Sequence, residues 1–183
     1  RAGDGNTGKD SAGRGMNAFI DRQFFVHDIV MSNATNFPNR IGLIYRDREY
    51  SWREIWEVVQ ALARGLSAQG VVRGSCVAVL DRNSDDLIFL YHATASLGAA
   101  LYPMSVLLRA PELAALIRTS KPKLLVVGAD FLDLAGNSIA GLDSVPKLVL
   151  RAGARDGALG WNDIADGPHH QPCSSPQSWD DTH

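Results

Sequence analysis

The sequence predicts an α/β domain with a mostly parallel, doubly wound sheet and flanking helices. Two apolar runs of strand length, residues 76–80 and 124–127, show no alternation of apolar and polar side chains. Unbroken runs of this kind are typical of strands that are covered on both faces in a parallel sheet. Segments with helical periodicity separate these runs and the connections are short, so strand–helix–strand units with right-handed crossovers are expected.

The first predicted elements precede this sheet. A helix is expected to begin near Ile20 and to end before Pro38, because proline disfavours a helical conformation in the residue before it. Residues 41–45 are predicted to form a strand. A tight turn at residues 47–48 would then lead into a second short strand at residues 49–50.

The next helix has a clear start and a clear stop. Ser51 and Glu54 form a capping-box pattern, in which the hydroxyl accepts from a free backbone N–H and the carboxylate accepts from the N–H of the cap residue. Gly70 is suited to the C-terminal stop. Apolar residues at helical spacing are expected to be buried on one face of this helix: Ile55, Val59, Leu62 and Leu66.

The rest of the predicted domain continues the alternation of strand and helix. Residues 83–86 start a helix after the first apolar run, with a capping side chain at its N-terminus, and Gly98 closes it. Pro111 is suited to the first turn of a later helix. The remaining elements are a strand at 99–102, the apolar strand at 124–127, a helix around 131–139 and a strand at 147–150.

These elements divide the chain into three parts. Residues 1–18 are expected to be a disordered leader, because they are rich in Gly, Asp, Asn and Ser and contain no apolar cluster. Within them, residues 3–10 begin like a phosphate-binding loop, but Asp10 stands where a hydroxyl should reach Mg²⁺ and no strand can precede it, so no nucleotide site is predicted there. Residues 19–150 are predicted to form the α/β domain, and residues 151–183 a loop-rich tail.

The composition excludes several classes of function. The formal net charge is −2, and the acidic and basic residues are mixed along the chain, so neither nucleic acid nor an anionic membrane is expected as a partner. No apolar run approaches the roughly 20 residues that a transmembrane helix needs. Cys76 lies in an apolar run and Cys173 in a polar tail, and two reduced thiols in a cytoplasmic protein are favoured over a disulfide.

The candidate ligand-binding residues follow the first apolar strand. Asn83 and Ser84 come just after it, and ligands of open α/β sheets bind beyond the carboxyl ends of the strands. Helix capping is the competing and favoured explanation of both residues. His92, on the same helix, could face a pocket, although a helical histidine is more often packed or solvated.

Other polar clusters are given structural explanations. Asp85 and Asp86 imitate a catalytic carboxylate pair, but their position at a helix start is explained by the helix dipole. His169, His170 and Cys173 offer too few ligands in too short a segment for a closed metal site, so a solvated loop is favoured. No catalytic residue and no metal ligand is therefore predicted.

Several short segments, in order, resemble the opening of the adenylate-forming superfamily, which includes acyl-CoA synthetases, 4-coumarate–CoA ligases, luciferases and nonribosomal-peptide adenylation domains. The segments are residues 50–55, 74–84, 95–103, 109–113 and 124–127. Leu97, Ser105 and Ala110 depart from the residues that are usual in that family. The resemblance covers roughly half of the chain.

The resemblance implies a parent protein that is an AMP-forming acyl-CoA (carboxylate–CoA) ligase, a class that includes enzymes of fatty acid metabolism. Such a parent would use ATP, Mg²⁺, CoA and a carboxylate substrate, and Asn83, Ser84 and His92 would contribute to its substrate or CoA channel. The family's phosphate loop, written Thr-Ser-Gly-Thr-Thr-Gly-x-Pro-Lys, does not occur in this sequence, and residues 179–183 resemble the stretch that precedes it.

The chain is therefore expected to be truncated before the ATP-binding residues and to be inactive alone. None of these cofactors is expected to bind it alone, and its expected partner is the remainder of the ligase polypeptide. The alternative interpretation is a noncatalytic α/β interaction module, a pseudo-ligase.

Overall fold

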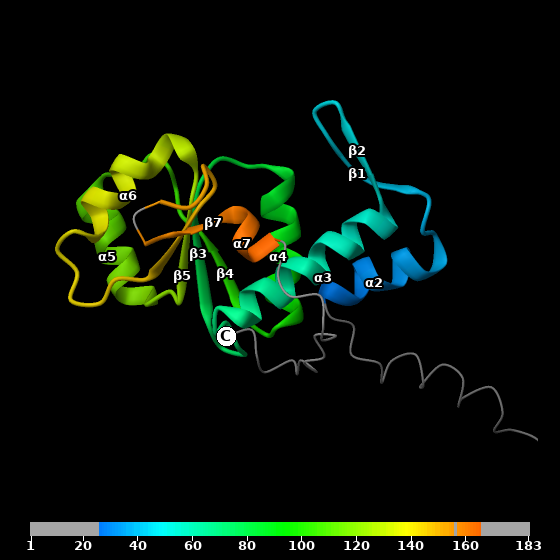
Figure 1. Cartoon of the computed structure of the whole chain (residues 1–183), viewed down its shortest axis with the longest axis horizontal. Coiled ribbons are helices and arrows are strands. Elements are labelled where there is room, and N and C mark those ends of the chain that lie inside the picture. Colours follow the sequence, from blue (N-terminus) through cyan, green and yellow to red (C-terminus); the bar gives the residue numbers. More distant parts are fainter. Residues whose placement is uncertain (1–25, 156, 166–183) are drawn as a thin grey trace, which may run out of the picture.

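A computed structural model describes residues 26–155 and 157–165 (Figure 1). Its main sheet has five strands in the order β4-β3-β5-β6-β7, and every neighbouring pair is parallel. The predicted α/β class with a parallel sheet is thereby confirmed. The strands are β3 (Cys76–Leu80), β4 (Ala100–Pro103), β5 (Leu124–Val127), β6 (Lys147–Leu150) and β7 (Leu159–Gly160).

Helices cover both faces of this sheet. On one face lie α3 (Trp52–Ala68), α4 (Asp85–Ser96) and α7 (Trp161–Ala165); on the other lie α5 (Ala110–Ser120), the short 3₁₀ helix η1 (Ala129–Phe131) and α6 (Leu132–Ile139). Successive side chains of β3 alternate between the two layers: Val77 and Val79 enter the core under α3 and α4, whereas Ala78 and Leu80 enter the core under α5 and α6. The apolar run therefore lacks alternation because both faces of the strand are buried.

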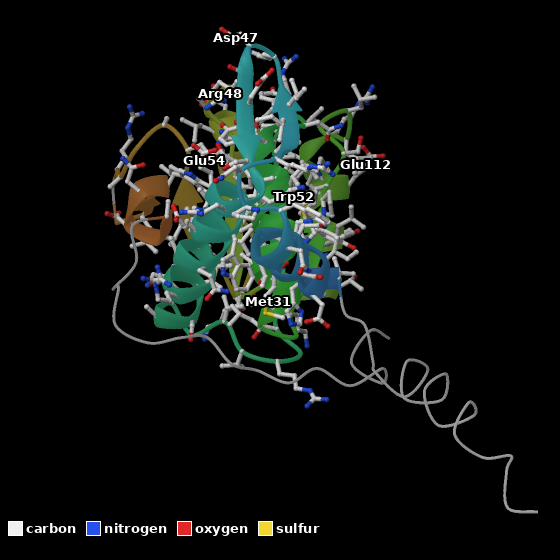
Figure 2. All side chains as sticks on the ribbon, turned by 90° about the vertical axis from the view of Figure 1, so that its right-hand side faces the viewer. Met31, Asp47, Arg48, Trp52, Glu54 and Glu112 are labelled. Atoms are coloured by element: carbon white, nitrogen blue, oxygen red, sulfur yellow. The ribbon has the colours of Figure 1, made fainter. Side chains whose placement is uncertain are left out.

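A smaller unit precedes the sheet. It consists of α2 (Val26–Asn36) and an antiparallel hairpin of β1 (Ile41–Tyr45) and β2 (Arg48–Ser51), which projects from the body of the protein (Figure 1). Figure 2 shows Asp47 at the hairpin tip and Trp52 where β2 runs into α3. The tight turn was expected at residues 47–48, but it lies at residues 46–47, because Tyr45 pairs directly with Arg48 across the hairpin.

The predicted start and stop of α3 are confirmed. The Ser51 hydroxyl accepts from the Glu54 N–H at 3.3 Å, and the Glu54 carboxylate accepts from the Ser51 N–H at 2.8 Å. Gly70 follows the C-cap residue with φ of 81°, a left-handed conformation that glycine adopts without strain. The four apolar residues expected on its inner face are all buried: Ile55, Val59, Leu62 and Leu66.

The segment after β6 differs from the expected loop. It adds a fifth strand, β7, and the helix α7, whose Ile164 is completely buried against α3. A strand of two residues and a helix of five are too short to give a periodic pattern, so the sequence did not reveal them. The expected leader at residues 1–18, residues 3–10 within it, and residues 166–183 of the tail lie outside the described residues.

Candidate functional site

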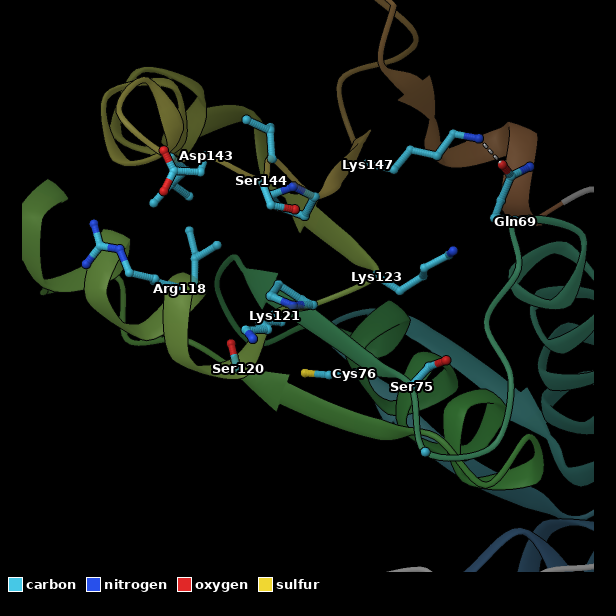
Figure 3. Close-up of a pocket in the computed structure, with 16 residues that line it drawn as sticks. Gln69, Ser75, Cys76, Arg118, Ser120, Lys121, Lys123, Asp143, Ser144 and Lys147 are labelled. Atoms are coloured by element: carbon cyan, nitrogen blue, oxygen red, sulfur yellow. Dashed lines mark hydrogen bonds between the residues drawn. The ribbon is translucent and has the colours of Figure 1, made fainter.

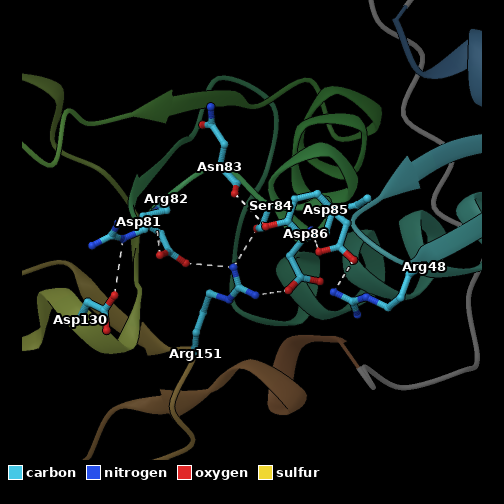
Figure 4. Close-up of polar contacts among 10 residues, drawn as sticks. Arg48, Asp81, Arg82, Asn83, Ser84, Asp85, Asp86, Asp130 and Arg151 are labelled. Carbon is cyan, nitrogen blue, oxygen red and sulfur yellow. Dashed lines mark hydrogen bonds and ion pairs between the residues drawn. The ribbon is translucent and has the colours of Figure 1, made fainter.

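The strand order creates a switch point between β3 and β5. The chain leaves β3 towards β4 on one side, and leaves β5 towards β6 on the other. Ligands of open α/β sheets bind at such a point, beyond the carboxyl ends of the strands. The loops that meet here begin at Asp81 after β3 and at Gly128 after β5, and Arg151 follows β6 at the same edge (Figure 4).

Arg151 makes contacts with several of the segments that meet at this edge. Its Nη1 donates to Asp81 Oδ2 and to Ser84 Oγ, both at 2.9 Å, and its Nη2 donates to the carboxylate of Asp86. The guanidinium carbon also lies 5.5 Å from the centre of the Trp161 ring, at the start of α7. One side chain therefore connects the β3–α4 loop, the first turn of α4 and α7 (Figure 4).

The close approach of the β3 and β5 loops requires a glycine. A Cβ placed on Gly128 would lie 2.1 Å from Asp81 Oδ1, which is much closer than any atoms can pack. The same oxygen accepts from the Arg82 N–H at 2.7 Å. The absence of a side chain at Gly128 thus leaves room for Asp81, and hydrogen bonds from Arg82 and Arg151 fix the position of its carboxylate.

A second ionic contact joins the hairpin to the same region. Asp85, only 2% exposed, accepts from Arg48 at 2.8 Å and from the Tyr50 hydroxyl at 2.5 Å, and both partners belong to β2. Burial, with a smaller effect of the hydrogen bond to Asp85, raises the pKa of Tyr50 to about 12. Burial also raises the pKa of Asp86, although the Arg151 guanidinium opposes this shift. The expected explanation of both carboxylates by the helix dipole alone is therefore incomplete.

Two of the three predicted site residues lie at this edge. Ser84 occupies the N-cap position of α4, but its hydroxyl makes no capping hydrogen bond and instead accepts from Arg151, so the expected side-chain cap of this helix by Ser84 is wrong. The backbone carbonyl of Asn83 accepts from the Tyr45 hydroxyl at 3.2 Å. Its side chain points away from Arg151 in Figure 4.

His92, the third predicted residue, is separated from these two. It lies farther along α4, a helix that packs against α2, and is close to the backbone of Val26. Its ring stacks edge-to-face with Tyr91, with 5.4 Å between centroids. Burial lowers the pKa of His92.

Asp81 and Arg151, which organise the edge, were not predicted from the sequence. A usable signal was present, because each is the first residue after a buried strand: Asp81 after β3 and Arg151 after β6. Since the carboxyl ends of parallel strands meet at one edge, polar residues at these two positions could have been expected to lie close together.

The charges of this edge limit the ligands that it can bind. Around the β3–α4 connection four carboxylates face three guanidinium groups, and each of these three is paired: Arg48 with Asp85, Arg82 with Asp130, and Arg151 with Asp81 and Asp86. A triphosphate needs cations that are free to face it. The described residues therefore do not fit the phosphates of ATP, although hydroxyl and amide groups are available for an uncharged ligand. Among the described residues no group of His, Cys, Asp and Glu is placed to hold a metal ion.

A larger groove of about 1060 Å³ lies at the opposite edge of the sheet (Figure 3). Its lining includes Cys76, Arg118, Lys121, Lys123 and Lys147, and burial raises the pKa of the Cys76 thiol. The C-termini of α3 and α5 end at this groove, and cations there complement the negative ends of the helices. The Lys147 ammonium donates to the side-chain carbonyl of Gln69, just beyond α3, at 2.5 Å. The basic groove is thus explained by helix termini.

The AMP-binding enzyme family matches residues 30–181, which is most of the chain. The chain belongs to this family. The predicted resemblance to adenylate-forming ligases is therefore confirmed, and the chain is an acyl- or aryl-CoA ligase family member that covers the N-terminal part of the fold.

Individual relatives are similar over the same part. The peroxisomal acetate/butyrate–CoA ligase AAE7 of Arabidopsis thaliana is 29% identical over 121 residues, or 66% of this chain and 20% of that protein. The indoleacetate–CoA ligase of Aromatoleum aromaticum is 33% identical over 95 residues, or 52% of this chain and 19% of that protein. The chain thus spans about a fifth of the length of these curated relatives.

A solved structure gives the same result for the fold. The anthranilate CoA ligase AuaEII, in complex with anthranoyl-AMP, aligns with a TM-score of 0.74 and 25% identity over 85% of this chain and 30% of that one.

None of the described helices has the length and apolar character that crossing a membrane requires.

Proposed function

We propose that this chain is the N-terminal part of an ATP-dependent, AMP-forming ligase that joins a carboxylic acid to CoA. The family match over residues 30–181 carries the proposal. The parent reaction would convert a carboxylate, CoA and ATP into an acyl-CoA, AMP and pyrophosphate. Mg²⁺, when bound, would neutralise phosphate charge in that reaction.

The substrate class rests on the relatives. Their names give acetate or butyrate, indoleacetate and anthranilate as the acids that those proteins activate. These acids share a carboxylate and differ in the group attached to it. We therefore propose a carboxylic acid substrate, and both an aliphatic acid, as fatty acid metabolism would require, and an aromatic acid are compatible with the relatives.

The proposed role of the described residues is to form the scaffold and one wall of the channel for the acid or for CoA. Asn83 and Ser84 support this role because they lie at the switch point of the sheet with uncharged polar groups. His92 contacts α2 instead, and we assign it a packing role.

We also propose that the chain has no ligase activity and binds none of these cofactors by itself, and that the remainder of the ligase polypeptide is its partner. Two observations support this. The family's phosphate loop, Thr-Ser-Gly-Thr-Thr-Gly-x-Pro-Lys, does not occur in the sequence, and the guanidinium groups of Arg48, Arg82 and Arg151 are already paired with carboxylates.

A chimera tests the proposed function. Residues 30–165 of this chain would replace the corresponding N-terminal segment of the indoleacetate–CoA ligase, and formation of the CoA thioester would be measured by chromatography and mass spectrometry. We expect the chimera to form the thioester, whereas the same ligase without any such segment should not. A chimera that unfolds cooperatively and is monodisperse, yet forms no thioester, would contradict the proposal.

A noncatalytic interaction module is the alternative, and one observation favours it. The described residues bury one cluster of apolar side chains on each face of the sheet, as an independently folding domain requires. Large exposed apolar side chains favour the ligase fragment instead, since Ile44 is 63% and Leu107 89% exposed. Sedimentation of the isolated chain separates the two: a module should be monodisperse, whereas a fragment should self-associate through these side chains.

A further inference from the structure

The Ser84 hydroxyl at the carboxyl edge acts as a hydrogen-bond acceptor within the protein. Its oxygen accepts from Arg151 Nη1 at 2.9 Å. A serine hydroxyl has one O–H donor in addition to its acceptor lone pairs. Because no described residue accepts a hydrogen bond from Ser84, and Arg151 occupies the acceptor side, the proton of this hydroxyl is available to a ligand.

Arg151 is itself fixed on several sides. Asp81 Oδ2 binds the same Nη1 at 2.9 Å, the carboxylate of Asp86 binds Nη2, and the Trp161 ring lies against the guanidinium. The side chain is mostly buried, with 26% of its surface exposed. A guanidinium with this many partners keeps one orientation, so it also keeps the Ser84 hydroxyl in one orientation.

The surroundings indicate what the hydroxyl can bind. The ionic groups of this edge are paired, and the carboxylates are in excess, so an anionic ligand would be repelled. The neighbouring Asn83 amide, which points away from the ion pairs in Figure 4, adds both donors and an acceptor without charge. An uncharged carbonyl or amide oxygen fits this combination better than a phosphate.

We propose that Arg151 is a positioning residue that orients the Ser84 hydroxyl to donate a hydrogen bond to an uncharged carbonyl or amide oxygen of the ligand. The inference rests on the proposed function, because it assigns the ligand to the same edge of the sheet.

Enzyme kinetics of the chimera provide the first test. Ser84→Ala and Arg151→Gln should each raise KM for either the acid or CoA by roughly three- to tenfold, the value of one hydrogen bond, with a smaller effect on kcat. The double variant should be no worse than Arg151→Gln, since both changes remove the same interaction. Arg151→Lys should recover part of the loss.

Arg82→Gln is the matched control. Arg82 lies at the same edge and pairs with the exposed Asp130 at 3.5 Å, but its side chain makes no hydrogen bond with Ser84. We expect its KM values to equal those of the parent chimera. If Ser84→Ala leaves both KM values unchanged, or if Arg82→Gln raises them as much as Arg151→Gln does, the inference is wrong even though the chimera is active.

Binding to the 183-residue chain tests the inference if the chimera is inactive and the proposed function fails. N-methylacetamide, an uncharged molecule with one amide group, and inorganic pyrophosphate would be titrated while the backbone amide resonances of Asn83 and Ser84 are followed by NMR. We expect N-methylacetamide to shift both resonances in the parent and in Arg82→Gln, and not in Arg151→Gln. Larger shifts with pyrophosphate, or none with N-methylacetamide, would overturn the proposal.

Discussion

Gly65 of α3 lies directly against the main chain of Ile164 of α7. A Cβ placed on Gly65 would be 1.8 Å from the carbonyl oxygen of Ile164, and the Ile164 side chain is completely buried. The two helices therefore touch backbone to backbone, which only a glycine permits. This contact attaches the last described helix to the first long one.

Gly65→Ala should separate these helices. The added methyl group must displace the α7 backbone, and overpacking of this kind costs about 1–3 kcal/mol in the free energy of unfolding. Urea denaturation would measure the loss, and the fluorescence of Trp161 in α7 should shift to longer wavelength, in comparison with a Trp161→Phe background that identifies its signal.

Gly136→Ala is the control for this change. Gly136 is also helical, in α6, but a Cβ placed there has no atom within 4 Å. Alanine should stabilise the protein by about 0.5–1 kcal/mol, as expected for a helix interior. Equal destabilisation by both substitutions would mean that helix propensity, and not the contact with Ile164, explains the effect.

Gly128→Ala should disturb the carboxyl edge. The new Cβ would clash with the Asp81 carboxylate and push it away from Arg151. We expect a loss of about 1–3 kcal/mol in unfolding free energy, the usual cost of overpacking. Asp81→Ala in the same chain should relieve part of the collision, so the double variant should lose less than the sum of the two single variants; strict additivity in urea melts would argue against this contact.

His92 should contribute to the pH dependence of stability. Burial lowers its pKa from 6.5, so the unfolded chain takes up this proton at a higher pH than the folded protein does. The free energy of unfolding should therefore fall as the pH decreases through that range, and His92→Gln should fall less between about pH 7.5 and pH 5. Parallel curves for the parent and the variant would contradict the assignment.

Ser51→Ala should weaken the start of α3. The hydroxyl satisfies the Glu54 N–H, and removal of such a cap costs about 1 kcal/mol. Ser67→Ala, at an exposed position near the other end of the same helix, should stay within about 0.5 kcal/mol of the parent. Thermal or urea unfolding of the two variants would reveal the difference, and similar losses would exclude a specific capping effect.

The sequence predicted the elements whose signals are local and repeated. The buried strands β3, β5 and β6, and the helix α3 with its capping box, were predicted because apolar patterning and capping chemistry act within a few residues. The hairpin turn was displaced by one residue, since the pairing of Tyr45 with Arg48, which decides it, leaves little trace in so short a loop.

The candidate site was predicted in part. Asn83 and Ser84 were found because they follow a recognisable strand, whereas the role of Arg151 depends on contacts with residues of the β3–α4 connection that are distant in the sequence. The helix α7 was missed for a related reason. Its position depends on the absence of a side chain at Gly65, a three-dimensional condition that no local pattern records.

The central place of β3 has a consequence for the order of folding. β3 is the first strand of the five in the sequence, yet it pairs with β4 on one side and with β5 on the other. A sheet that starts from β3 can therefore grow in both directions from contacts that are relatively close in the sequence, and such contacts form early. β6 and β7 would be added last, so during synthesis on the ribosome a three-stranded intermediate should exist before Arg151 emerges to close the carboxyl edge.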